Sequence, residues 1–213
     1  MRAISDLAHP GQPAPVAIVL LPAAGTGPED FVRAGFVAAV RERGLPIDLI
    51  FAPLEFGHVT DRSVIARVRT EYLAPARARG SALWLGGISL GGYVALCCAE
   101  REPAGFAGLC LFAPYLGSYL VTNEITRTGL AGWDGQGADD DDERRLWRFI
   151  KNRRAQPPIH LGLGLEDRFG ERHRLLAQAL APGEVDTVPG GHDWPTWRRL
   201  WDNFLDARFT PRT

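Results

Sequence analysis

The sequence is poor in cysteine, and the few thiols it has are badly spaced for cross-links or metal. Among 213 residues there are three cysteines, Cys97, Cys98 and Cys110, and two of them are adjacent. An odd, clustered set is a poor disulfide framework, and no Cys/His group has the spacing of a zinc site. We therefore expect reduced, buried cysteines, a cytoplasmic location, no bound metal and no cofactor.

Neither charge sign is in excess, and long apolar runs are missing. The 24 basic and 25 acidic residues leave a formal net charge of −1, whereas nucleic-acid binding usually requires clustered Lys and Arg. The apolar run 14–24 is shorter than the roughly 20 residues of a membrane helix and lacks the charged leader of a signal peptide. We expect no nucleic-acid partner and no membrane span.

What the sequence does have is a regular alternation of apolar strands and amphipathic helices. The pattern predicts strands at 16–21, 47–52, 82–88, 106–113, 159–165 and 185–188, with helices at 28–43, 60–79, 90–100, 172–180 and 194–207. Strands separated by helices imply an α/β fold: a three-layer doubly wound sandwich around a mainly parallel sheet of about six strands. The length fits a single domain, 1–213.

The segment 115–156 interrupts this alternation. It carries four glycines between 129 and 137, the acidic run 139–143 and a basic stretch after it. We interpret it as a small cap-like excursion containing one or two helices. The acidic run is typical of a solvated helix N-terminus, and a metal site there is the less favoured alternative.

The sharpest motif is Gly87-Ile88-Ser89-Leu90-Gly91, a G-x-S-x-G pattern. It follows an apolar strand and opens a helix, the context in which a tight turn exposes a nucleophilic serine. Glycine two positions to either side of Ser89 lets the strand and the helix approach. The alternative is a glycine-rich turn with a capping serine.

A serine nucleophile needs a base. His192 follows the last strand in the stretch Gly190-Gly191-His192-Asp193-Trp194. Loops after parallel strands gather at one edge of the sheet, where Ser89 also lies. His192 is therefore the predicted base, and His58, in the loop after the second strand, is held in reserve as a substrate-binding residue.

The base in turn needs a carboxylate. Glu166 and Asp167 follow the strand 159–165, and we prefer Asp167 because it lies further into the turn. Alternatively, Asp167 caps the next helix or pairs with Arg168. The order Ser89, Asp167, His192 is that of the α/β-hydrolase class.

An oxyanion hole requires two N–H donors. The N–H of Leu90 is one. The other comes from the small-residue loop after the first strand, with Ala24 preferred and Ala23 next. A phosphate cradle in this loop is disfavoured, because the glycine spacing does not fit a nucleotide-binding motif.

The strand, the GISLGG turn, the GLED turn and the GGHDW turn together resemble the α/β-hydrolase superfamily over essentially the whole chain. The resemblance implies a nucleophile Ser89, an acid Asp167 and a base His192. The His-bearing stretch is also similar to the esterase D-like group. Two departures stand out: residues 1–15 leave little room for a leading hairpin, and the oxyanion loop reads Pro-Ala-Ala where many members have His-Gly. We therefore expect a trimmed sheet without that hairpin and a site near the surface.

The excursion occupies the place where such hydrolases insert a cap. Its residues Tyr115, Leu116, Tyr119 and Trp133 either line an apolar acyl pocket or pack the excursion onto the sheet.

The sequence therefore predicts a serine hydrolase of the carboxylesterase or thioesterase type, which cleaves a small or medium ester through an acyl-enzyme on Ser89. Activity should rise with pH as a histidine base becomes neutral. The alternatives are a non-catalytic binding protein of this fold and a hydrolase acting on an amide or C–C bond.

Overall fold

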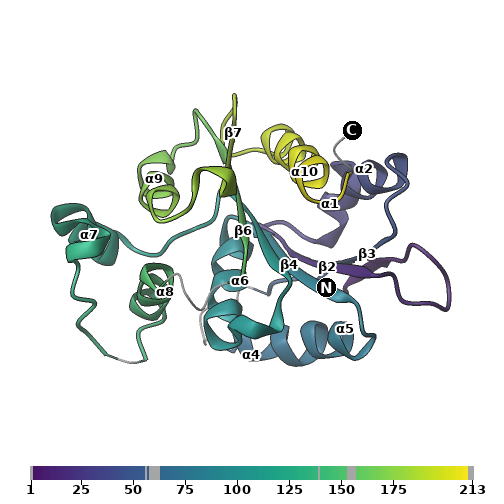
Figure 1. Ribbon diagram of the computed structural model, residues 1–213, viewed down its shortest axis with the longest axis horizontal. Helices are drawn as coiled ribbons and strands as arrows, with labels where there is room; N and C mark the ends of the chain where they lie inside the picture. Colours follow the sequence, from purple (N-terminus) through teal and green to yellow (C-terminus); the bar gives the residue numbers. More distant parts are fainter. Residues whose placement is uncertain (1, 56, 58–62, 139, 153–156, 211–213) are drawn as a thin grey trace.

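The computed structural model describes residues 2–55, 57, 63–138, 140–152 and 157–210 (Figure 1). Within them seven strands form one sheet in the order β1-β3-β2-β4-β5-β6-β7. Their bounds are β1 Ile4–Asp6, β2 Val16–Leu21, β3 Ile47–Phe51, β4 Ala82–Ile88, β5 Gly108–Phe112, β6 Ile159–Gly164 and β7 Val185–Val188. The α/β class is confirmed. The sheet has one strand more than the pattern predicted.

All neighbouring strands run parallel except β1, which pairs antiparallel with β3. The central strands β4 and β5 are buried along nearly their whole length, as continuous apolar strands covered on both faces should be. A leading hairpin would place two antiparallel strands ahead of β2, and here β1 is the one described strand in that position. Its three residues carry no alternation, so sequence pattern could not have revealed it.

Helices cover both faces of the sheet. Helices α1 (Pro28–Arg33), α2 (Phe36–Glu42) and α10 (Trp194–Arg208) share one apolar core with one sheet face. On the other face lie α4 (Val64–Val68), α5 (Ala74–Ala78), α6 (Leu90–Arg101), α8 (Asp142–Lys151) and α9 (Gly170–Gln178). Figure 1 shows α10, α1 and α2 above the sheet and α4, α5 and α6 below it.

The single helix predicted over 28–43 is divided into α1 and α2. Gly35 adopts a left-handed conformation with φ of 81°, which interrupts the helical backbone. Its carbonyl accepts a hydrogen bond from Nε of Arg198 at 3.2 Å, so α10 holds the break in place. The prediction of one helix was wrong here because a tertiary contact competes with local helical preference.

The helix predicted over 60–79 contains a π-helical turn, Arg69–Leu73, between α4 and α5. Pro75 has no N–H to donate to the carbonyl of Glu71, and a widened turn just before it accommodates this gap. The predicted start of this helix, at residue 60, lies outside the described residues.

The excursion forms α7 (Tyr119–Gly132) and α8, within the range predicted for it. Asp141 caps α8, because its carboxylate accepts hydrogen bonds from the N–H groups of Glu143 and Arg144 at 3.0 and 3.1 Å. Trp147 anchors α8 through a buried hydrogen bond from Nε1 to the Leu116 carbonyl at 3.1 Å. The cap is therefore tied to the segment that follows β5.

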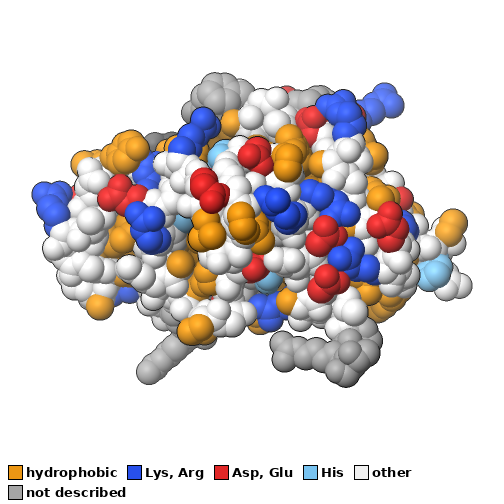
Figure 2. Space-filling model, turned by 90° about the horizontal axis from the view of Figure 1, so that it is seen from above, with side chains coloured by type: hydrophobic (Ala, Val, Ile, Leu, Met, Phe, Trp, Pro, Cys, Tyr) orange, Lys and Arg blue, Asp and Glu red, His pale blue; other side chains and the backbone are white. Residues whose placement is uncertain are grey.

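The surface carries both charge signs. On the face seen in Figure 2, acidic and basic side chains are interspersed, and apolar side chains form small separate groups. Surface ion pairs account for part of this mixing, for example Arg43 with Asp202 at 2.9 Å. In the part of the chain that is described, no helix combines the length and apolar character needed to cross a membrane.

Candidate active site

The turn between β4 and α6 holds Ser89 in an unusual backbone conformation. Ser89 has φ of 51° and ψ of −112°, in a region that favours glycine. Its N–H donates to the Phe112 carbonyl at 3.0 Å, and its carbonyl accepts the N–H groups of Tyr93 and Tyr115 at 3.2 and 2.8 Å. The half-buried serine is thus held at the carboxyl end of β4 by its neighbour strand and by the segment that follows it.

Glycine at both flanks of this turn is required by packing. A Cβ on Gly87 would overlap the backbone of Gly91, and a Cβ on Gly91 would overlap the carbonyl group of Leu21. The turn therefore fits only small residues, as the G-x-S-x-G pattern predicts. The second contact also shows that the loop after β2 lies directly against the start of α6.

Asp167 and His192 form a hydrogen-bonded pair. Nδ1 of His192 lies 2.7 Å from Oδ2 of Asp167, and the Asp167 side chain is fully shielded from solvent. The other carboxylate oxygen accepts the N–H of Phe169 at 2.8 Å. Burial by itself raises the pKa of Asp167, but the hydrogen bonds from His192 and Phe169 outweigh burial and hold this pKa below its usual value.

The two loops that carry this pair are packed backbone against backbone. A Cβ on Gly164 would overlap the carbonyl of Gly190, so glycine at the end of β6 permits the approach. Glu166 braces the same contact: its N–H donates to the Gly190 carbonyl at 3.0 Å, and its carboxylate accepts the Gly190 N–H. Of the two neighbouring acids, Asp167 contacts the histidine and Glu166 holds the loops together.

Two aromatic rings fix the plane of the His192 imidazole. Phe169 and Trp197 each place a ring centroid 5.1 Å from the imidazole, at interplanar angles of 80° and 87°. Edge-to-face contacts of this kind favour one ring orientation. The His192 side chain keeps 11% of its surface exposed, so the imidazole is not fully closed off from solvent.

The loop after β2 leaves backbone donors available. The Ala23 carbonyl accepts both the N–H and the hydroxyl of Thr26, at 3.2 and 2.9 Å, which folds the loop into a tight turn. Within the described part of the chain, the N–H groups of Ala24 and Leu90 donate no hydrogen bond. Both are therefore available to a ligand oxygen, as an oxyanion hole requires.

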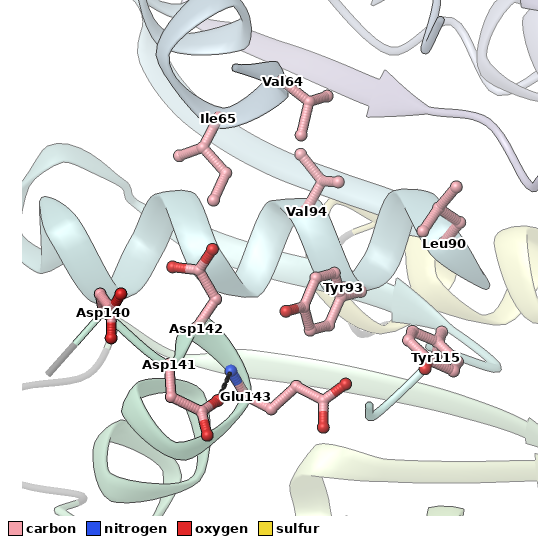
Figure 3. Close-up of a pocket in the computed structure, with 10 residues that line it drawn as sticks. All are labelled: Val64, Ile65, Leu90, Tyr93, Val94, Tyr115, Asp140, Asp141, Asp142 and Glu143. Carbon is pink, nitrogen blue, oxygen red and sulfur yellow. Dashed lines mark hydrogen bonds between the residues drawn. The ribbon is translucent and has the colours of Figure 1, made fainter. Parts of the chain in front are cut away.

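A cavity of about 480 Å³ opens beside Leu90 (Figure 3). It lies between α6, the start of α4 and the start of α8. Its lining residues are Val64, Ile65, Leu90, Tyr93, Val94, Tyr115, Asp140, Asp141, Asp142 and Glu143. One wall is apolar, Tyr93 and Tyr115 form an aromatic end near Leu90, and the opposite wall is acidic.

Of the four cap residues singled out in the sequence, Tyr115 lines this cavity. Leu116 and Trp133 are buried at 1% and 2% exposure, where they pack the excursion onto the domain. Tyr119 is 63% exposed, and the Arg172 guanidinium lies 3.5 Å from its ring centroid. His58 lies outside the described residues.

The sequence did not indicate that Tyr93 or the residues of α4 belong to the site. Tyr93 lies one helical turn after Ser89, so α-helical spacing alone could have placed it beside the serine. Val64 and Ile65 reach the cavity only through packing of α4 against α6, which no local pattern reveals. The described residues contain no cluster of three or more His, Cys, Asp or Glu side chains able to hold a metal ion.

The chain belongs to the Esterase family. The family model, described as "Putative esterase", matches residues 1–205. The chain is 24% identical over 172 residues to an acetyl esterase of Caldicellulosiruptor saccharolyticus, in a match that covers 71% of this chain and 62% of the relative. It thus spans less than two thirds of that relative's length.

Solved α/β structures share the fold. An S-formylglutathione hydrolase from Staphylococcus aureus superposes with a TM-score of 0.64 at 13% identity, covering 91% of this chain and 80% of that one. A second S-formylglutathione hydrolase, from Agrobacterium tumefaciens, has a TM-score of 0.62 at 17% identity. The match covers 92% of this chain and 83% of that one. A monoacylglycerol lipase from Paleococcus ferrophilus has a TM-score of 0.63 at 17% identity. The match covers 96% of this chain and 98% of that one.

Proposed function

We propose that this chain is a serine hydrolase that cleaves small or medium carboxylic esters or thioesters through an acyl-enzyme on Ser89. The observation that carries the proposal is the 2.7 Å hydrogen bond between Asp167 and His192. The pair follows β6 and β7 at the sheet edge where the Ser89 turn follows β4. Nucleophile, base and acid thus occupy loops at one edge of a parallel sheet.

In the proposed mechanism, Oγ of Ser89 attacks the carbonyl carbon of the ester, and Nε2 of His192 takes the serine proton. The tetrahedral intermediate places its negative oxygen toward the N–H groups of Leu90 and Ala24, with the Ala23 N–H as the alternative second donor. The intermediate collapses as His192 gives its proton to the leaving alcohol or thiol. Water, deprotonated by His192, then attacks the carbonyl carbon of the acyl-enzyme. The bond between this carbon and Oγ of Ser89 breaks, Oγ takes the proton back from His192, and the acid is released.

Asp167 acts through His192 in this scheme. Its carboxylate accepts Nδ1–H, which leaves Nε2 free to act as a base. Because hydrogen bonding lowers the pKa of Asp167, the carboxylate stays ionised at neutral pH and stabilises the imidazolium that forms during the reaction.

The relatives support an ester or thioester as the substrate. The curated relative is named as an acetyl esterase, and the structural neighbours include S-formylglutathione hydrolases and a monoacylglycerol lipase. A cavity of about 480 Å³ fits a small or medium acyl or alcohol group. The three buried free thiols fit a reducing compartment such as the cytoplasm.

The test is turnover of p-nitrophenyl acetate and butyrate by the wild type and by Ser89→Ala. We expect the variant to lose at least roughly 1,000-fold in kcat, because no other hydroxyl replaces the nucleophile. Ser5→Ala, at an exposed position of β1, is the matched control and should keep wild-type turnover. Unchanged turnover in Ser89→Ala would refute the mechanism, and absence of turnover in the wild type would favour a non-catalytic binding protein.

A further inference from the structure

We propose that the cavity beside Ser89 selects esters by charge, accepting neutral or positively charged groups and rejecting negatively charged ones. The inference rests on the proposed hydrolase function, because it treats this cavity as the place that receives one side of the ester. It assigns a role in specificity to the start of α8 and to Tyr93.

The lining of the cavity changes along its length, from aromatic and apolar side chains at one end to acidic side chains at the other. Leu90 and Tyr115 lie at one end, close to the Ser89 turn, and Asp140 lies at the other end along α6 (Figure 3). Asp142 and Glu143 lie between them on the α8 side. A substrate whose reacting carbonyl is at Ser89 would therefore place its far end against carboxylates.

The acidic wall is only partly compensated by basic groups. Asp142 pairs with Arg101 at 2.8 Å, and Asp141 pairs with Arg144 at 3.2 Å. None of the ten side chains that line the cavity is basic.

Among the acidic residues in Figure 3, Glu143 extends its side chain toward Tyr115, at the end of the cavity near Leu90. It accepts hydrogen bonds from the N–H and the hydroxyl of Ser118, at 2.8 and 2.6 Å, and both of these donors are neutral. Among the described residues, no basic side chain forms an ion pair with it. These two hydrogen bonds hold the Glu143 side chain in one conformation, so its charge has a fixed position in the cavity wall.

The negative charges of Asp142 and Glu143 also affect the end of the cavity near Leu90. Burial raises the pKa of Tyr115, and the charge of Glu143 raises it further, while Arg172 on α9 acts in the opposite direction. Burial also raises the pKa of Tyr93, and Asp142 and Glu143 add to that effect. The charge of Glu143 thus affects both phenols, at the end of the cavity where the ester carbonyl would lie.

The aromatic end suits a cation and not an anion. Tyr93 and Tyr115 pack edge to face, with ring centroids 5.5 Å apart and an interplanar angle of 65°. The face of an aromatic ring attracts a cation and repels an anion. The carboxylates act in the same sense. Because Glu143 forms its hydrogen bonds with Ser118 at an exposed position, the effect of its charge should depend on ionic strength.

The experiment compares three p-nitrophenyl esters of similar acyl length: butyrate, the monoester of succinate, which ends in a carboxylate, and 4-(trimethylammonio)butyrate. We expect kcat/KM for the succinate ester to be about tenfold below that for the butyrate ester at low salt, and the cationic ester to match or exceed butyrate. Raising the ionic strength of the wild-type assay should narrow the gap, because screening weakens charge interactions.

Glu143→Gln is the informative variant, since an amide oxygen can still accept from Ser118 while the charge is lost. It should narrow the gap in kcat/KM between the succinate and butyrate esters by about threefold. Glu171→Gln is the matched control: Glu171 is also an acid in the first turn of a helix, α9, but is exposed and does not line the cavity. It should leave the gap unchanged.

Equal kcat/KM for the anionic and neutral esters, or a gap insensitive to both salt and Glu143→Gln, would overturn the charge selection while leaving the hydrolase function intact. The salt series uses the wild type alone, so it decides the matter even if the variant folds poorly. Loss of Ser89-dependent turnover of the neutral ester would instead overturn the proposed function and the inference with it.

Discussion

Two neighbouring carboxylates, Glu166 and Asp167, have different surroundings and should differ in their effect on catalysis. Asp167 is buried against His192, whereas Glu166 is exposed and bonds the backbone of Gly190. We expect Asp167→Asn to lower kcat for p-nitrophenyl acetate by about 10³- to 10⁴-fold, because an amide cannot hold the imidazole in the reactive tautomer.

Glu166→Gln serves as the control, because its amide oxygen can still accept the Gly190 N–H. It should retain kcat within about twofold. An equally large loss of activity in Glu166→Gln and Asp167→Asn would contradict this. It would show that the rate depends on the packing of the two loops and not on the carboxylate that contacts His192.

His160 should make the protein sensitive to mild acid. It is 4% exposed within β6, and burial lowers its pKa to about 4 from an ordinary 6.5. Between these values the unfolded chain binds the proton and the folded chain does not, so stability falls as pH decreases from 6.5 toward 4. The effect amounts to about 2 kcal/mol at pH 5.

The check is urea unfolding of the wild type and His160→Leu at pH 7 and pH 5. The variant should lose about 2 kcal/mol less stability than the wild type between these two values. Equal losses in the two proteins would mean that His160 is protonated in the folded chain, or that the fold relaxes around it.

The strand–turn–helix element around Ser89 should tolerate no added methyl group. We expect Gly91→Ala to destabilise the protein by about 1–3 kcal/mol and to displace the loop after β2, because the new Cβ would overlap the Leu21 carbonyl. Gly183→Ala is the control, since a Cβ there meets nothing within 4 Å. Thermal melting of both variants tests this, and an unchanged Tm for Gly91→Ala would contradict the packing described.

Most elements of the fold were predictable because apolar strands and amphipathic helices alternate. The strands 16–21, 82–88 and 185–188 have the predicted bounds. β1 was missed because three residues carry no pattern. The break at Gly35 was missed because it depends on Arg198, which is distant in the sequence.

Within the site, the sequence could predict only the residues that come directly after the carboxyl ends of strands. Asp167 and His192 were paired from their positions after β6 and β7, and the structure brings them to 2.7 Å. The cavity lining was not predictable, because α4 and the start of α8 reach it through packing between distant segments. The acidic run 139–143 was interpreted as a solvated helix N-terminus, and residues 140–143 also form a wall of the cavity.

The thermal stability of the whole molecule should not depend on whether a reductant is present. All three cysteines are free and buried, and burial raises the pKa of the Cys98 thiol to about 12. A thiolate is needed for rapid reaction with thiol reagents. We expect no thiol to react in the native protein, three to react after denaturation, and the Tm to be the same with and without dithiothreitol. Rapid labelling of the native protein would contradict this arrangement of the core.

The central claim is that Ser89 is an activated nucleophile at the edge of the sheet. The most direct measurement is the intact mass of the protein after reaction with a fluorophosphonate, followed by peptide mapping. The account predicts one adduct per chain, on Ser89, absent in Ser89→Ala and formed much more slowly in His192→Ala. An adduct elsewhere, or an unchanged labelling rate in either variant, would contradict it.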